Sequence, residues 1–201
     1  MLNENILVYV LIIFIIFVCI QIYRHTPYFH LKCIISDENG NTYCVREREL
    51  PQEAVELLAR IDGRCKALVK YIGEQHPEKE SVKRLTENFK EIEIQEILPS
   101  STLTAYTENK GERMAFCLQK SEKSEEVSRK LIDEELLFFV AMHELSHVMT
   151  KSVGHTKEFW DNFKFILTEA NKANMYVPVD YEKTPKEYCG MNISNNPYFD
   201  E

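Results

Sequence analysis

The sequence predicts an α+β fold in which a small mixed sheet packs on a central apolar helix, preceded by one transmembrane helix. Three observations lead to this prediction: an unbroken apolar run near the N-terminus, short segments of alternating hydrophobicity around turn residues, and longer segments with helical periodicity. The 201 residues suffice for one domain with a hydrophobic core. The net charge of -8 argues against direct binding of nucleic acid, which requires a basic surface.

The apolar run covers residues 6–20 and reads ILVYVLIIFIIFVCI. We expect an N-terminal stub over 1–5 and a transmembrane helix over 6–23, since 18 helical residues span ~27 Å. The start of the chain is not basic and no small-residue cleavage site follows, which argues against a cleaved signal peptide. Basic residues occur only from Arg24 onward, so the positive-inside rule predicts an outer N-terminus and a cytoplasmic C-terminal domain, in a host or virion membrane.

The cysteines show no C-x-x-C spacing, which argues against a zinc knuckle or a redox motif. We therefore expect free, partly buried thiols and a reducing compartment. The alternative for one pair is a disulfide between Cys33 and Cys44 across a hairpin. The six cysteines are Cys19, Cys33, Cys44, Cys65, Cys117 and Cys189.

A linker over 24–30 leads into the domain, which is predicted to cover 31–175. Its first element is a hairpin, because two short apolar segments flank the turn dipeptide Asn39-Gly40. Pro51 favours the first position of a helix, and helical spacing of apolar residues then continues to about residue 75.

Pro77 interrupts this pattern, and a second amphipathic helix is expected after it. The segment EIEIQEIL (91–98) fits either a strand or the end of that helix. The segments TLTAYT (102–107) and RMAFCLQ (113–119) flank a turn-rich sequence and predict a second hairpin.

Two helices are expected in the last third of the domain, over about 127–150 and 156–173, with Gly154 as the helix stop between them. The remaining tail, 176–201, contains three prolines and is predicted to be extended coil. It is long enough to cover a cleft and inhibit it, and Cys189 offers a thiolate ligand for a metal.

The first of these two helices carries the motif H-E-x-x-H, formed by His143, Glu144 and His147. Imidazoles four residues apart lie on one helix face and can bind one metal ion, and Glu144 lies close enough to act as general base on a metal-bound water. The surrounding sequence LLFFVAMHELSHVM is apolar on nearly every side, so these polar groups must be satisfied inside the core. Two hydrogen-bonded core histidines without a metal are the alternative.

A catalytic Zn²⁺ requires a third protein ligand and one open position. His155 follows the glycine turn directly, and imidazole suits zinc, so His155 is the preferred third ligand. The alternatives are carboxylates on the next helix, namely Glu158, Asp161 and Glu169.

The stretch HELSHVMTKSVGHTKEFW (143–160) resembles the WLM-type family of zinc metalloproteases, which is related to the SprT/Spartan-like zincins. Those families carry H-E-L-x-H, a short insert, a glycine and a histidine, with an aromatic residue four positions later, here Phe159. Seven residues separate His147 from His155, more than is usual in WLM proteins. Compact membrane-anchored proteins of this kind also resemble proteins of large DNA viruses.

The resemblance implies a zincin-like domain that cleaves proteins. Together with the motif it predicts a membrane-anchored zinc metallopeptidase in which His143, His147 and His155 bind Zn²⁺ and Glu144 is the general base. Tyr181, Tyr188 and Tyr106 are candidate donors to the oxyanion of the transition state. An extended peptide substrate is expected to bind along the strand of 114–119. The alternative function is a catalytically inactive, zinc-stapled and membrane-tethered protein-interaction domain.

Overall fold

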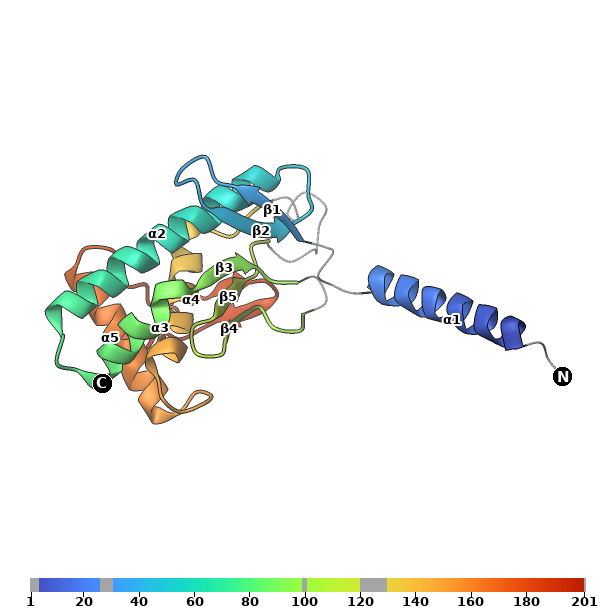
Figure 1. Ribbon diagram of the computed structural model, residues 1–201. Helices are drawn as coiled ribbons and strands as arrows, with labels where there is room; N and C mark the ends of the chain where they lie inside the picture. Colours follow the sequence, from blue (N-terminus) through green and yellow to red (C-terminus); the bar gives the residue numbers. More distant parts are fainter. Residues whose placement is uncertain (1–3, 26–30, 99–100, 120–129, 201) are drawn as a thin grey trace.

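The computed structural model describes residues 4–25, 31–98, 101–119 and 130–200 (Figure 1). It is an α+β structure with a mixed sheet, in agreement with the predicted class. The five strands lie in the order β1-β2-β3-β5-β4. Pairs β1–β2 and β4–β5 are antiparallel, whereas β2–β3 and β3–β5 are parallel. The strands are β1 (Leu31–Ile35), β2 (Thr42–Arg46), β3 (Glu93–Glu96), β4 (Ala105–Glu108) and β5 (Arg113–Phe116).

The N-terminal helix α1 (Glu4–His25) lies apart from the rest of the chain in Figure 1. The predicted membrane span over 6–23 is wrong, and with it the single-pass localisation: among the described residues, no helix combines the length and the apolar character that crossing a bilayer requires. The physical reason is the length of the uninterrupted apolar run within this helix. The run without a polar residue ends at Ile20 and measures about 22 Å, less than a hydrocarbon core of about 30 Å.

Helices cover the sheet and carry most of the core. The long helix α2 packs on β2 and β3, and the central helix α4 contacts β4, β5 and three other helices. Pro51 occupies the first turn of α2, as predicted. The helices are α2 (Pro51–Gln75), α3 (Glu80–Asn88), α4 (Glu134–Met149) and α5 (Lys157–Lys172), with short 3₁₀ helices η2 (Phe89–Glu91) and η3 (Pro197–Phe199).

Helix α4 begins later than the sequence predicts. Asp133 is its N-cap, and the Asp133 carboxylate accepts hydrogen bonds from the backbone N–H groups of Glu135 and Leu136. Residues 130–133 are not helical, and 127–129 lie outside the described residues. Nearly all of α4 is buried, which agrees with its uniformly apolar sequence.

The C-terminal tail folds onto the domain, although its sequence predicts extended coil. It forms a two-stranded hairpin, β6 (Lys186–Tyr188) and β7 (Met191–Ile193), followed by η3. Three tyrosines anchor it in the core, where each is at most 3% exposed: Tyr176, Tyr181 and Tyr188. Because these aromatic side chains are separated by polar and turn residues, no periodicity in the sequence indicates their burial.

Two disulfides replace the free thiols that we predicted for four cysteines. Cys33–Cys44 joins directly opposite residues of β1 and β2, which is the alternative considered for this pair. Cys117–Cys189 joins the residue after β5 to the turn of the β6–β7 hairpin. Cys65 remains a buried free thiol in α2. Cys189 therefore has no thiolate to offer a metal.

Gly111 is required by the turn between β4 and β5. Its φ is +135°, and an added Cβ would lie 2.6 Å from the backbone oxygen of Asn88. We expect Gly111→Ala to lower the free energy of unfolding by about 2 kcal/mol or more, measured by urea denaturation. Gly63→Ala is the matched control, because an added Cβ there meets nothing within 4 Å. In the interior of α2 it should raise stability by about 0.5–1 kcal/mol, and equal effects of the two changes would contradict the prediction.

Candidate metal centre

Helix α4 carries the two histidines of the motif one helical turn apart, and Glu144 directly follows the first of them. His143 and His147 lie on one face, with ring centroids 5.1 Å apart. Glu144 is 4% exposed and lies beside them on the same helix. This is the arrangement expected from the i, i+4 spacing of the motif.

The third imidazole, His155, comes from the loop between α4 and α5. Gly154 has φ +81°, a left-handed conformation that turns the chain back toward α4. Two side chains hold this loop by its backbone. Lys110 Nζ donates to the carbonyls of Thr150 (2.9 Å) and Ser152 (2.5 Å), and the Glu158 carboxylate accepts from the N–H groups of Lys151 and Ser152.

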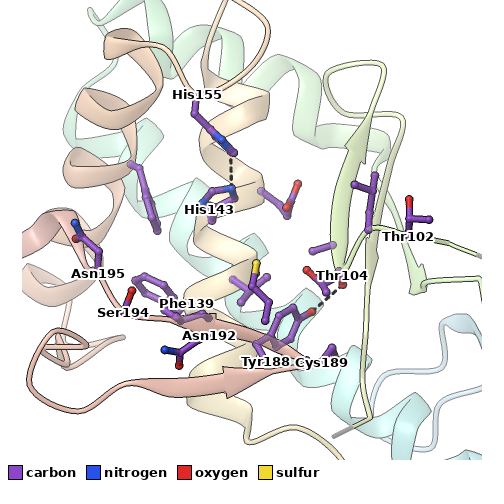
Figure 2. A pocket seen from close by; sticks show the side chains of 18 of the residues that line it. Thr102, Thr104, Phe139, His143, His155, Tyr188, Cys189, Asn192, Ser194 and Asn195 are labelled. Atoms are coloured by element: carbon purple, nitrogen blue, oxygen red, sulfur yellow. Dashed lines mark hydrogen bonds between the residues drawn. The ribbon is translucent and has the colours of Figure 1, made fainter. Parts of the chain in front are cut away.

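The three imidazoles converge on one point. The Nε2 atoms of His143 and His155 are 3.1 Å apart (Figure 2), and one nitrogen from each of the three rings lies within 4.8 Å of the others. Two nitrogens bound to one tetrahedral zinc at 2.0–2.1 Å would be about 3.3 Å apart, so this set of neutral nitrogen donors fits Zn²⁺.

An aromatic side chain forms the floor of this cluster. The ring of Phe159 lies 4.3–4.8 Å, centroid to centroid, from the rings of His143, His147 and His155. Burial, with the neighbouring imidazoles, lowers the pKa of His143 to about 3, and burial also lowers the pKa of His147 to about 4. Both rings are therefore neutral near pH 7, which is the form that binds a metal.

Glu144 has a single side-chain partner among the described residues. Thr107 Oγ1, from strand β4, donates to Glu144 Oε2 at 2.8 Å. Burial raises the pKa of Glu144 to about 7, and the hydrogen bond from Thr107 opposes this shift. A carboxyl group with a pKa near 7 is suited to accept and return a proton at neutral pH.

The carboxylates considered as alternative third ligands have other partners. Glu158 binds the loop backbone, Asp161 pairs with Lys157 at 2.8 Å, and Glu169 lies between His76 (2.9 Å) and Lys172 (2.7 Å). His155 is the residue that the structure brings to the two motif histidines.

The tyrosines proposed as transition-state donors differ in position. Tyr181 is buried with its ring 4.8 Å from that of Phe139, and it is absent from the lining of both cavities beside the histidines. Tyr188 reaches one cavity, but its hydroxyl donates to the Thr104 carbonyl at 3.2 Å (Figure 2). Tyr106, on β4, lines the other cavity. Neither Tyr181 nor Tyr188 therefore has a free hydroxyl beside the histidines that would donate to an oxyanion.

Two cavities flank the cluster. The larger, about 710 Å³, lies toward the β6–β7 hairpin, and we call it the apolar cavity. The smaller, about 560 Å³, lies toward the β4–β5 turn, and its lining includes Thr107 and Lys110 together with apolar side chains such as Leu103 and Val153. The five residues that line both are Leu103, Ala105, His143, Glu144 and His155. The candidate metal centre thus lies in the middle of a cleft that follows strand β4.

Thr107 and Lys110 are site residues that the sequence analysis missed. Both come from the segment 105–111, more than 30 residues before the motif, and neither belongs to a recognisable pattern. Their roles depend on β4 lying at the edge of the sheet beside α4, which only the tertiary structure shows.

Comparison with known proteins places the chain among viral relatives. It is 32% identical to "Uncharacterized protein R325" of Acanthamoeba polyphaga mimivirus over 165 residues, which cover 80% of this chain and 81% of the relative. The chain belongs to the family of this mimivirus protein. Shorter matches connect parts of the chain to proteins of iridescent viruses.

These shorter matches cover part of each protein. "Uncharacterized protein 136R" of Invertebrate iridescent virus 6 is 30% identical over 99 residues, 49% of each chain. "Uncharacterized protein 042R" of Invertebrate iridescent virus 3 is 33% identical over 64 residues, 32% of this chain and 39% of the relative. No protein-family model and no solved structure matches the chain. The relation to WLM-type metalloproteases therefore stays a prediction.

Proposed function

We propose that this protein is a zinc-dependent metallopeptidase that hydrolyses peptide bonds of protein substrates. The observation that carries the proposal is the convergence of three imidazoles from α4 and the α4–α5 loop beside the buried carboxylate of Glu144. A purely structural zinc site is closed by four protein ligands, whereas three ligands at an open cleft are typical of a catalytic site. The H-E-x-x-H motif and its resemblance to WLM-type proteases support the same function.

The chain's own residues supply the remaining chemistry. Bound Zn²⁺ would lower the pKa of a water molecule and polarise a substrate carbonyl. Glu144 is positioned to take the proton from the attacking water and to return it to the leaving amine. The hydrogen bond from Thr107 orients the Glu144 carboxylate, and the floor formed by Phe159 limits the movement of the imidazoles.

The proposed substrate is an extended peptide. Among the strands of the described residues, β4 is the last of the sheet, and an edge strand is where an extended peptide can add as a further strand. The cleft runs along this strand, with the histidines at its centre. Strand β5, part of the segment we expected to bind substrate, cannot serve because it is paired on both sides, with β3 and β4.

Metal analysis tests the proposal directly. We expect the purified full chain to bind one zinc ion and to cleave an unstructured protein substrate such as casein. A chelator such as 1,10-phenanthroline should abolish the cleavage, and added Zn²⁺ should restore it. His143→Ala should lose the zinc, whereas His76→Ala, a histidine paired with Glu169 outside the cluster, should retain it.

The outcomes separate the proposal from its alternatives. Absence of zinc would overturn the metal centre and leave a set of packed core histidines. Bound zinc without cleavage of any peptide would favour a zinc-stapled interaction domain instead.

A further inference from the structure

The apolar cavity lies directly beside the candidate metal centre. Helices α4 and α5 form one side and the β6–β7 hairpin forms another, and His143 and His155 lie at one end of the cavity (Figure 2). Glu144 also lines it. Its volume of about 710 Å³ falls in the range of binding sites for small ligands. The apolar side chains that line it are mainly Phe139, Val140, Trp160, Phe163, Met191 and Ile193.

The hairpin wall of this cavity is fixed in place. The Cys117–Cys189 disulfide ties its turn to the end of β5. The Tyr188 ring is fully buried, and its hydroxyl donates to Thr104 at 3.2 Å. After the hairpin, Asn196 Nδ2 donates to the Val179 carbonyl at 2.9 Å. The cavity is therefore shaped before any ligand binds, which lowers the entropic cost of binding.

The chemistry of the lining selects the kind of group that fits. Apart from Glu144 and the two histidines, the lining side chains of the described residues are apolar or neutral. An Asp or Glu side chain would lose hydration there without gaining a partner of opposite charge, and a Lys or Arg side chain would find such a partner only in Glu144 at the metal centre. Asn192 of the hairpin, with Ser194 and Asn195 just after it, adds neutral polar groups to the lining, which are of the kind that bind backbone amides of a peptide.

We propose that the apolar cavity binds a large apolar side chain, such as Phe, Leu or Met, of the substrate residue next to the bond that is cut. This inference rests on the proposed peptidase function and adds a substrate class to it. The specificity-determining residues are Trp160 of α5 together with Met191 and Ile193 of the hairpin.

The only tryptophan of the chain lines this cavity, so binding can be measured without activity. The full-length Glu144→Gln protein is titrated with capped tripeptides that carry Phe, Ala or Lys at the central position. The fluorescence of Trp160 should change on binding of the Phe peptide, with an affinity at least about tenfold higher than for Ala or Lys. Equal affinities, or strongest binding of the Lys peptide, would overturn the proposal.

Variants of the two disulfides provide a matched pair. Replacing both Cys117 and Cys189 with Ser should remove the preference for Phe over Ala, because the hairpin wall loses its tether. Replacing both Cys33 and Cys44 with Ser also removes one disulfide, but at the β1–β2 hairpin away from the cavity, and should keep the preference. Loss of the preference in both or in neither would contradict the assigned role of the hairpin.

A second variant covers the case in which the first double variant does not fold. Met191 is 48% exposed, so Met191→Lys is compatible with folding, and it places a cation at the cavity. It should weaken binding of the Phe peptide at least about tenfold, and unchanged binding would contradict the proposal.

The experiments distinguish failure of the proposed subsite from failure of the proposed peptidase function. Cleavage without side-chain preference rejects the subsite alone, whereas selective binding without cleavage by the wild-type chain rejects the peptidase alone.

Discussion

Glu144→Gln is expected to lower the kcat of peptide cleavage by about 10³-fold while the zinc content stays unchanged. Glutamine keeps the size of the side chain and can still accept the hydrogen bond from Thr107, but it cannot take a proton from water. General acid–base catalysis typically contributes 10²- to 10⁴-fold, which sets this magnitude. Steady-state kinetics on a fluorogenic peptide, with metal content measured on the same sample, checks the prediction.

Glu135→Gln is the control for this change. Glu135 lies in the first turn of the same helix, where it is exposed and paired with Arg64. Its replacement should change kcat less than about twofold, since exposed ion pairs contribute little to stability. A Glu144→Gln protein with zinc bound and near-normal kcat would exclude Glu144 as the general base.

Local patterns in the sequence predict the parts of the site that are close in the chain. The i, i+4 spacing of His143 and His147 specifies a shared helix face, and Gly154 specifies a turn before His155. The hairpin around Asn39-Gly40 and the helix that begins at Pro51 are also predicted, because turn and cap residues act locally.

Contacts between distant segments are not visible in the sequence. Thr107 reaches Glu144 across 37 residues, Lys110 reaches Ser152 across 42, and Cys117 pairs with Cys189 across 72. Each of these depends on the order of strands in the sheet or on the folding of the tail. For the apolar N-terminal run the sequence predicted too much: its composition suggested a membrane span, but no helix of the described residues is both long enough and apolar enough to cross a membrane.

His155→Ala is expected to weaken zinc binding on the order of 100-fold, measured by competition with a chromophoric chelator. Three ligands share a binding free energy on the order of 10 kcal/mol, so the loss of one removes about 3 kcal/mol. Peptide cleavage at low zinc should fall in parallel and should recover partly at high zinc.

Glu158→Gln separates the ligand role from loop positioning. Glu158 holds the backbone of Lys151 and Ser152, and glutamine keeps one of its two acceptor oxygens. Zinc affinity should therefore fall by about tenfold, at the low end of the roughly 10- to 100-fold range for residues that orient a ligand without binding the metal. If Glu158→Gln lost the metal and His155→Ala retained it, the third ligand would be a carboxylate. The 3.1 Å separation between the nitrogens of His155 and His143 would then reflect the packing of both rings on Phe159 rather than a shared ion.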